Sequence, residues 1–430
     1  MKVLVIGSGG REHAIVWKLQ QSPLVQKLYC APGNAGIAQL ADVVPIKQND
    51  IEGLARFAGR EHIDLTVVGP EQPLVLGLVD VFRRQGLSVF GPTRSAAQLE
   101  GSKIFAKDFM RRHRIPTAKY AAFASGEQKA AAQFIQTLDP PVVVKADGLA
   151  AGKGVLICPS RADADDAVRG MMEGRFGDAG SRVVVEEYLS GEEASLFVLT
   201  DGSRFVTLSP AQDHKRILDG DLGKNTGGMG AYAPAPVVTP EALGKVIESI
   251  VKPTLNGMRS EGIPYTGCLY IGLMITASGS KVLEYNCRFG DPEAQVVIPL
   301  VDADFADLLL SIAQNRLNPA LVRLHPASAV CVVIASQGYP DEYQTGRQIL
   351  GLDRVRAEEG VIVFHAGTRE EDGRIVTSGG RVLGVTAVGY QHDLEGTIRA
   401  AYRAVQQITF DGAYYRSDIG RKALAHLQQN

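Results

Sequence analysis

Lys145 and Lys153 enclose a segment whose composition is typical of phosphate binding. The three valines at 142–144 follow two prolines and predict a buried strand that presents Lys145 at a fixed place. The glycine-rich segment 148–154 has little side-chain bulk and can fold over a polyanion with its amides pointing inward. One lysine on a strand and one in a loop suit a triphosphate that is held and then covered. The alternative is a glycine-rich hairpin with a surface lysine, since the Gly-Lys-Ser/Thr ending of a P-loop is absent.

A second polar group lies on one face of a predicted hairpin strand. Glu284, Asn286 and Arg288 occupy alternate positions and therefore project from the same face. The residues between them are apolar, and the rigid sequence GDPE follows. Carboxylate and amide oxygens suit Mg²⁺, and an arginine beside them can hold a phosphoryl group. We interpret this strand as a metal and phosphate site, with a solvent-exposed polar stripe as the alternative.

The first residues predict a strand, a glycine turn and a helix. Lys2–Gly10 is an apolar run that ends in glycines, and an amphipathic pattern continues from Arg11. Free amides and the helix dipole at such a turn favour an anion, and Arg11 and His13 can add charge. Glu12 occupies the third glycine position of GxGxxG, and no acid lies about twenty residues further on to bind a ribose. Dinucleotide binding is therefore disfavoured, and an ordinary tight turn remains the alternative.

A helix with two lysines on one face is predicted within Gly101–Pro116. Ser102 is a suitable N-cap, and Pro116 limits the helix at its other end. Lys103 and Lys107 are one turn apart and so lie side by side. Surface lysines are usually solvated, so this pair supports a phosphate site only together with the other segments.

Two later segments carry groups that suit a nucleotide or a small substrate. After a strand at 183–185, the connection 186–193 offers backbone groups, apolar residues and acids, which an adenosine requires. An acidic surface turn is the alternative. The run 210–234 is glycine-rich and densely charged, and a loop of that length indicates either function or disorder.

Composition excludes several classes of protein. The 45 Lys and Arg residues nearly balance the 47 Asp and Glu residues, so no global field attracts nucleic acid or an anionic membrane. The five cysteines are widely spaced without a CxxC pair, which argues against a disulfide framework or a zinc site. Met1 leads directly into a strand-like run, and no apolar run is long enough to span a membrane. We expect a soluble cytoplasmic protein and, without a self-complementary apolar stripe, a monomer.

These elements predict a multidomain α/β and α+β chain. Strands alternating with helices predict a doubly wound parallel sheet in the N-terminal domain, residues 1–101. A central part follows at 102–323. Short strands and one amphipathic helix predict a small α+β domain at 324–430, without chemistry of its own.

The order of these motifs resembles the ATP-grasp superfamily. Within it, GSGGREHA, PVVVKADGLAAGKGV, EEYLSGEEASL, PAQDHKR with NTGGMGAY, and EYNCRFGDPE resemble the phosphoribosylamine-glycine ligase family, as does YRSDIG near the C-terminus. The resemblance implies an ATP-grasp core at 102–323 with a lid subdomain at about 119–189. It also implies a ligase of purine biosynthesis that joins glycine to 5-phosphoribosylamine and cleaves ATP through a glycyl phosphate.

The resemblance also implies roles for individual residues. It places ATP on Lys103, Lys107, Lys145, Gly152, Lys153, Glu186, Glu187, Leu189 and Glu193. It places Mg²⁺, with Mn²⁺ as a second option, on Glu284 and Asn286. It assigns the reaction to Arg288, Lys215 and Asp213, with Asp213 also binding the glycine ammonium. The sugar phosphate is expected at Gly9, Gly10, Arg11, Glu12, His13, Asn34, Pro70 and Glu71.

Several questions stay open at the level of sequence. The strand preceding Glu284 carries no acid, in contrast to many superfamily members, so the number of metal ions is undecided. Another ATP-grasp ligase with a different acid or amine is the main alternative function. A nucleotide-binding regulator without turnover and a nicotinamide-dependent oxidoreductase are two others.

Overall fold

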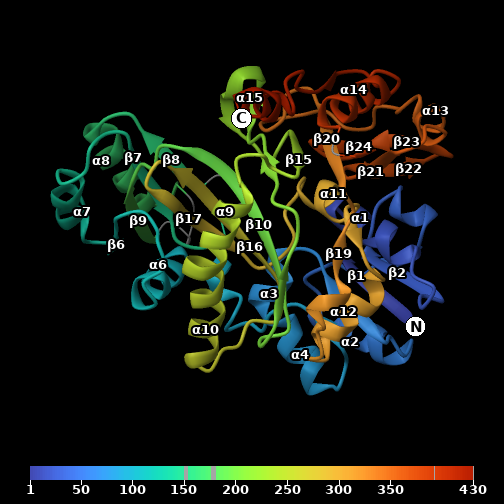
Figure 1. The fold of residues 1–430 in the computed structure, drawn as a ribbon, viewed down its shortest axis with the longest axis horizontal. Coiled ribbons are helices and arrows are strands. Elements are labelled where there is room, and N and C mark those ends of the chain that lie inside the picture. Colours follow the sequence, from blue (N-terminus) through green and yellow to red (C-terminus); the bar gives the residue numbers. More distant parts are fainter. Residues whose placement is uncertain (150–153, 176–180, 392, 430) are drawn as a thin grey trace.

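The N-terminal part of the chain is a parallel sheet with helices on both faces (Figure 1). Its elements are β1 (Lys2–Gly7), α1 (Gly10–Gln20), β2 (Lys27–Pro32), β3 (Asp42–Val43), α2 (Ile51–Arg60), β4 (Leu65–Val68), α3 (Glu71–Leu76), α4 (Leu78–Arg84) and β5 (Val89–Phe90). The strand order is β3-β2-β1-β4-β5. In β1, Val3 and Val5 pack with α1, whereas Leu4 and Ile6 pack with α2 and α4. Burial on both faces explains the continuous apolar run, and the predicted doubly wound sheet is confirmed.

An antiparallel sheet with helices on one face begins the central part. It consists of β6 (Tyr120–Ala124), β7 (Val142–Ala146), β8 (Val155–Cys158) and β9 (Arg182–Glu187), in the order β6-β9-β7-β8. Val142 and Val144 of β7 pack with α7 (Gln128–Ile135) and α8 (Arg161–Gly170). Alternation therefore turns Lys145 to the opposite face, and Glu186 of β9 likewise. Glu186 and Glu187 thus lie within β9, where they pair with Val143 and Val142, and not in the connection that the sequence predicted.

A second antiparallel sheet faces this one. It consists of β10 (Glu192–Thr200), β11 (Phe205–Thr207), β16 (Gly267–Thr276) and β17 (Gly279–Asn286), in the order β11-β10-β16-β17. β16 and β17 form the hairpin that the sequence predicted. The predicted helix of the lysine pair is α6 (Lys103–Arg112), capped by Ser102.

The C-terminal sheet takes strands from two distant parts of the chain. It contains β12 (Gln212–Asp213), β15 (Gly230–Ala233), β20 (Ala327–Ser336), β21 (Val361–His365), β24 (Arg381–Tyr390) and β25 (Ala413–Tyr414). Its main path is β12-β15-β20-β24-β21, and β25 pairs with β20. The run 210–234, predicted to be a loop, therefore supplies two strands of this sheet and the hairpin β13 (Arg216–Leu218) with β14 (Leu222–Asn225).

The structure, a computed structural model, describes residues 1–149, 154–175, 181–391 and 393–429. Its other elements are η1 (Ile37–Gln39), α5 (Gln98–Gly101), η2 (Met171–Arg175), η4 (Asp219–Asp221), α9 (Pro240–Val246), η5 (Ile247–Val251), α10 (Lys252–Ser260), α11 (Ala294–Val297), β18 (Val301–Asp302), α12 (Phe305–Ala313), η6 (Pro319–Leu321), β19 (Arg323–Leu324), α13 (Leu352–Arg356), β22 (Thr368–Glu371), β23 (Arg374–Thr377), α14 (Leu394–Val405) and α15 (Arg421–Gln429). Within these described ranges, every helix is too short or too polar to cross a membrane.

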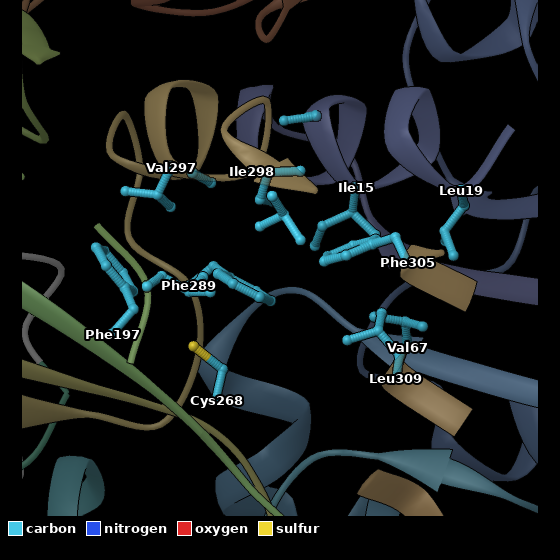
Figure 2. Close-up of a cluster of buried hydrophobic side chains, with 14 of the residues drawn as sticks. Ile15, Leu19, Val67, Phe197, Cys268, Phe289, Val297, Ile298, Phe305 and Leu309 are labelled. Carbon is cyan, nitrogen blue, oxygen red and sulfur yellow. The ribbon is translucent and has the colours of Figure 1, made fainter. Parts of the chain in front are cut away.

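One apolar cluster joins the N-terminal sheet to the rest of the molecule. Figure 2 shows Ile15 of α1 and Val67 of β4 in the same cluster as Phe305 and Leu309 of α12. The cluster continues through Phe289 to the second central sheet. Because these side chains come from separate parts of the chain, their packing fixes the N-terminal turn relative to the strand end at Arg288.

Truncating the centre of this cluster should destabilise the protein strongly. Leu309 is fully buried, so Leu309→Ala removes apolar contacts and leaves a cavity. We expect a loss of about 2–5 kcal/mol of unfolding free energy. Urea denaturation followed by tryptophan fluorescence measures it. Leu321→Ala is the matched control because Leu321 is 66% exposed, and an equal loss in both variants would contradict the packing argument.

Candidate active site

Two lysines from different elements converge on one buried carboxylate. Lys145 of β7 and Lys107 of α6 approach the same oxygen of Glu186, with Nζ–Oε2 distances of 3.1 and 3.0 Å. Burial alone would raise the pKa of Glu186, but the two lysines lower it, so the carboxylate is ionised. Burial lowers the pKa of Lys107 to about 8. Glu186, which the sequence predicts to frame adenine, is the counterion of both lysines.

Lys103 lies where α6 meets the glycine-rich segment. Its Nζ donates to the carbonyl oxygen of Gly148 at 2.8 Å. The Ser102 hydroxyl accepts from the Phe105 amide and donates to Asp147, at 3.1 and 3.0 Å. The start of the glycine-rich segment is therefore attached to the start of α6. The predicted ATP contacts Gly152 and Lys153 lie outside the described residues.

A small apolar cluster follows the end of β9. Ala118, Leu189 and Met274 are buried together, and Leu283 packs against them. Their side chains provide the kind of apolar surface that an adenine ring requires, as the sequence predicted for Leu189. Glu187, at the end of β9, precedes Leu189 in the chain. Its Oε1 accepts from Lys281 Nζ at 3.2 Å.

Glu284 and Asn286 lie together on β17. The Asn286 amide donates to Glu284 Oε1 at 3.5 Å. Burial alone would raise the pKa of Glu284, but Lys215, Lys145 and Lys103 lower it. An ionised carboxylate beside an amide oxygen fits a hard cation such as Mg²⁺. In the described residues no set of three His, Cys, Asp or Glu side chains is grouped for metal binding, so phosphate oxygens and water would complete the coordination.

Asp213 of β12 and the neighbouring Lys215 face two glutamates. Lys215 Nζ lies 2.5 Å from Glu193 Oε2. Burial alone would lower the pKa of Lys215, but Glu193 and Asp213 raise it well above its usual value. Burial raises the pKa of Asp213 to about 7, and Glu293 adds to this rise. Glu193, predicted for the ribose, is here the partner of Lys215, and the acids around Lys215 can accept a further cationic group.

Arg288 joins the end of β17 to the N-terminal domain. It contacts Glu71 through Nε at 3.2 Å and Glu100 through Nη2 at 3.1 Å. Glu100 also accepts from the Cys287 amide at 2.6 Å. Burial raises the pKa of Glu100, and Arg288 opposes that rise. Glu100 was not predicted, because its partner is distant in the chain and no local pattern marks it.

The glycine turn before α1 binds the side-chain carboxylate of Glu12. Glu12 accepts from the Gly9 amide at 2.6 Å and from Arg11 Nε at 2.6 Å. A Cβ on Gly69 would lie 2.1 Å from Glu12 Oε1, which explains why that position requires glycine. Gly10 begins α1. Glu12 therefore supplies the negative charge at the helix N-terminus where the sequence predicted a phosphate.

Two other predicted substrate residues have internal partners across the interface with the C-terminal sheet. His13 Nδ1 accepts from the His365 amide at 2.8 Å. The Asn34 amide donates to the carbonyl oxygens of Ser8 and His365, at 2.8 Å each. Pro70 caps α3 and places Glu71 at its first position. Of the predicted substrate group, Glu71 thus contacts Arg288 and Arg11 donates to the carbonyl oxygen of the next residue, Phe289, at 3.1 Å. His13 and Asn34 hold domains together.

Models of the phosphoribosylglycinamide synthetase family match the chain in three parts. The N domain matches residues 1–100, the ATP-grasp (A) domain 101–294 and the C domain 329–422. The chain belongs to the phosphoribosylglycinamide synthetase family. A phosphoribosylamine-glycine ligase of Vibrio parahaemolyticus is 51% identical over 433 residues that cover 100% of both chains. One from Chlorobaculum tepidum is 52% identical over 429 residues, covering 99% of this chain and all of the other.

Solved structures support the same placement. A phosphoribosylamine-glycine ligase from Thermotoga maritima is 35% identical and superposes with a TM-score of 0.85, covering 97% of this chain and 100% of the other. A biotin carboxylase from Campylobacter jejuni has a TM-score of 0.75 at 13% identity, which shows a shared fold only, over 100% of this chain and 98% of the other. The predicted family and ATP-grasp fold are confirmed. ATP-grasp proteins bind ATP together with a divalent metal, and the phosphoribosylglycinamide synthetase family contains such an ATP-grasp domain.

Two acids that follow Arg288 also have partners in the structure, although the sequence predicts no role for them. Asp291 and Glu293 belong to the GDPE segment. Asp291 pairs with Arg381 of β24 at 3.2 Å, and Glu293 accepts from the Ser195 hydroxyl at 3.1 Å. The rigid turn after Arg288 was a usable signal for both acids, whereas nothing local indicated Arg381.

Proposed function

We propose that this chain joins glycine to 5-phosphoribosylamine and forms glycinamide ribonucleotide in purine biosynthesis, while ATP is cleaved to ADP and phosphate. One observation carries the proposal. The chain matches enzymes named phosphoribosylamine-glycine ligase at about half identity over its whole length, including the segments outside the ATP-grasp core. The Campylobacter jejuni biotin carboxylase shares the fold over the whole chain, but only 13% of its residues are identical.

The reaction needs two displacements because an ionised carboxylate is a poor electrophile. First, a glycine carboxylate oxygen attacks the γ-phosphorus, the bond to the bridging oxygen breaks, and ADP leaves with that electron pair. Lys103 and Lys145 hold the phosphates, and Lys215 and Arg288 stabilise charge on the transferred group. Glu284 and Asn286 would hold Mg²⁺ or Mn²⁺, which would neutralise part of the phosphate charge.

In the second displacement, the amine of 5-phosphoribosylamine attacks the carbonyl carbon of glycyl phosphate. The carbon–oxygen bond to phosphate breaks, phosphate leaves, and the amine loses a proton to solvent. We assign the sugar phosphate to the start of α1 at Gly10 and Arg11, next to Glu71. The contact of Glu71 with Arg288 supports this assignment, because a residue proposed for the sugar phosphate meets the residue proposed for the acyl phosphate.

Glycine binding should depend on pH through Asp213. We assign the glycine ammonium to this carboxylate, whose pKa burial raises to about 7. The ionised fraction falls about tenfold between pH 8 and pH 6, so glycine affinity should fall by about the same factor. Calorimetric titration of glycine in the presence of a non-hydrolysable ATP analogue measures it. Asp213→Asn should bind weakly at both pH values, and an unchanged pH slope in that variant would assign the dependence to another group.

The raised pKa of Asp213 also predicts how folding stability changes with pH. The native state holds a proton on Asp213 between about pH 4 and pH 7, whereas the unfolded chain does not. Stability contributed by this group therefore falls as the pH rises through that range. Urea midpoints of the unsubstituted chain and Asp213→Asn, compared at pH 5 and pH 7.5, should converge at the lower pH.

The function is tested by ADP release from the purified protein with ATP and Mg²⁺. Glycine and freshly generated 5-phosphoribosylamine are added singly and together. We expect release that needs both substrates, with glycinamide ribonucleotide appearing in equal amount. ATP binding without release for this pair would instead direct the search to another acid and amine.

We also infer a monomer that works in the cytoplasm. The five cysteines are all buried and unpaired, which suits a reducing compartment. Light scattering on the purified chain tests the monomer, and a mass near 92 kDa, about twice the 46.0 kDa of the chain, would contradict it.

A further inference from the structure

The hairpin β13–β14 continues directly from Lys215 and has little apolar surface to hold it. All four residues of β14 are exposed, and Leu218 and Leu222 are 46% and 64% exposed. The amide and hydroxyl of Thr226 donate to the Lys215 carbonyl oxygen at 2.7 and 2.9 Å, so the hairpin closes on Lys215. A two-stranded hairpin of this kind is marginally stable in water. Its position must be set by contacts with another part of the chain.

Those contacts come from the segment 413–419, near the C-terminus. Arg416 in this segment is completely buried. Its Nε and Nη2 donate to the two oxygens of Asp418 at 2.7 Å each. Its Nη1 donates to Asp221 Oδ1 at 2.9 Å and to the Arg216 carbonyl oxygen at 3.0 Å. A guanidinium matches this planar arrangement of oxygens, which a lysine ammonium cannot do.

Neighbouring residues of the same segment bond to β13 and to the turn that follows it. The Tyr414 hydroxyl donates to the Ile217 carbonyl oxygen at 2.9 Å. The Ser417 amide donates to Asp219 at 2.9 Å, and Asp418 accepts from the Gly220 amide at 2.8 Å. The segment is itself anchored, because β25 pairs with β20 of the C-terminal sheet. A rigid sheet thus holds the hairpin through these side chains.

His214, between Asp213 and Lys215, shows on which side of this segment the Arg416 cluster lies. Its ring is buried, and neither ring nitrogen has a hydrogen-bond partner in the described part of the chain. Burial first, and then Arg416 and Lys422, lower the pKa of His214 to about 4, so the ring is neutral. Along an extended backbone, His214 faces away from Asp213 and Lys215. The proposed substrate side and the Arg416 side are therefore opposite sides of the segment 213–215.

We propose that Arg416 is a positioning residue for Lys215. It holds the base of β13 through the Arg216 carbonyl oxygen and the tip through Asp221, and so fixes where the Lys215 ammonium stands relative to Glu193. This inference rests on the proposed function, in which Lys215 stabilises the transferred phosphoryl group. The C-terminal domain then takes part in phosphoryl transfer through the backbone of the hairpin and not by contact with substrate.

Arg416→Lys tests the proposal because it keeps the charge and removes the planar fork. We expect kcat for glycine-dependent ADP release to fall by about 10²-fold, since misplacement of a catalytic group by about 1 Å costs that much. The KM for ATP should stay within about twofold, because Lys107 and Lys145 are held by Glu186 and Lys103 by the Gly148 carbonyl oxygen, and these partners lie outside the hairpin. Amide hydrogen exchange at 216–225 should become faster, while exchange in β20 and β24 stays the same. Arg399→Lys is the control, since Arg399 forms an exposed pair with Glu395 on α14 of the same domain.

A folded Arg416→Lys protein with unchanged kcat, or with unchanged exchange at 216–225, would overturn the proposal. If that variant does not fold, Tyr414→Phe removes a single hydrogen bond to the hairpin. In Tyr414→Phe, amide exchange at 216–225 should still become faster and kcat should fall. The absence of either effect would also overturn the proposal. Failure of the unsubstituted chain to form glycinamide ribonucleotide would refute the proposed function instead, and hydrogen exchange then still reports whether Arg416 holds the hairpin.

Discussion

Glu284→Ala should abolish metal-dependent turnover. Glu284 is the ionised carboxylate among Lys103, Lys145, Lys215 and Arg288, and these cations lower its pKa despite burial. Without it, Asn286 alone offers an oxygen at this place on β17. We expect the rate of glycinamide ribonucleotide formation to fall by at least about 10³-fold, the upper range for loss of one group that organises transition-state charge. A coupled assay of ADP release over a range of Mg²⁺ and Mn²⁺ concentrations measures it.

ATP binding without metal distinguishes this explanation from a general loss of the site. Removing one negative charge from a cationic cluster should leave the affinity for a polyanion unchanged or higher. Calorimetry of ATP in the presence of a chelator should therefore give comparable binding for both proteins. Glu371→Ala is the matched control, because Glu371 lies on strand β22 in an exposed pair with Arg369. Retained metal-dependent turnover in Glu284→Ala would overturn the metal assignment.

Arg288→Ala should have the second largest effect on the rate. We assign this side chain to the acyl phosphate, and losing such a group costs about 3 to 4 kcal/mol, or roughly 10² to 10³ in kcat. ATP affinity should change less, because Lys103 and Lys145 remain. Steady-state kinetics with ATP and glycine varied separately gives both values. A rate near that of the unsubstituted chain would remove Arg288 from the mechanism.

The contacts of Arg288 add a second expectation for the same variant. Arg288→Ala leaves Glu100 buried without its cation, and breaking a buried pair costs about 3–5 kcal/mol of stability. The double variant Arg288→Ala with Glu100→Gln removes that unpaired charge. It should recover much of the urea midpoint but none of the lost kcat. Recovery of activity along with stability would show that Arg288 acts only as a structural partner of Glu100.

Local patterns predicted most elements because their causes are local. The valines of β7, the Ser102 cap of α6 and the β16–β17 hairpin follow from burial, capping and alternation within a few residues. The alternate spacing of Glu284, Asn286 and Arg288 likewise predicts one shared face without reference to any tertiary contact. The run 210–234 was predicted less well, since β12 and β15 become strands only by pairing into a sheet whose other members follow β20 in the chain.

Site partners were harder to predict because they depend on contacts between distant residues. Glu186 was expected near adenine, yet the pleat of β9 turns it toward Lys107 and Lys145. Glu12 was expected near a phosphate, yet its length lets it reach back to the Gly9 amide. In each case the geometry decided which charged group the carboxylate meets.

By itself, the sequence determined the family and most of the strand and helix patterns, and it predicts a set of residues for phosphate and metal, because residue types and short spacings carry that information. Only the tertiary structure decided that Arg288 lies between Glu71 and Glu100, that His13 and Asn34 join domains, and that Arg416 reaches the hairpin beside Lys215. These pairings join residues far apart in the chain. They exist because the shared core brings three sheets together, and no local pattern encodes the resulting distances.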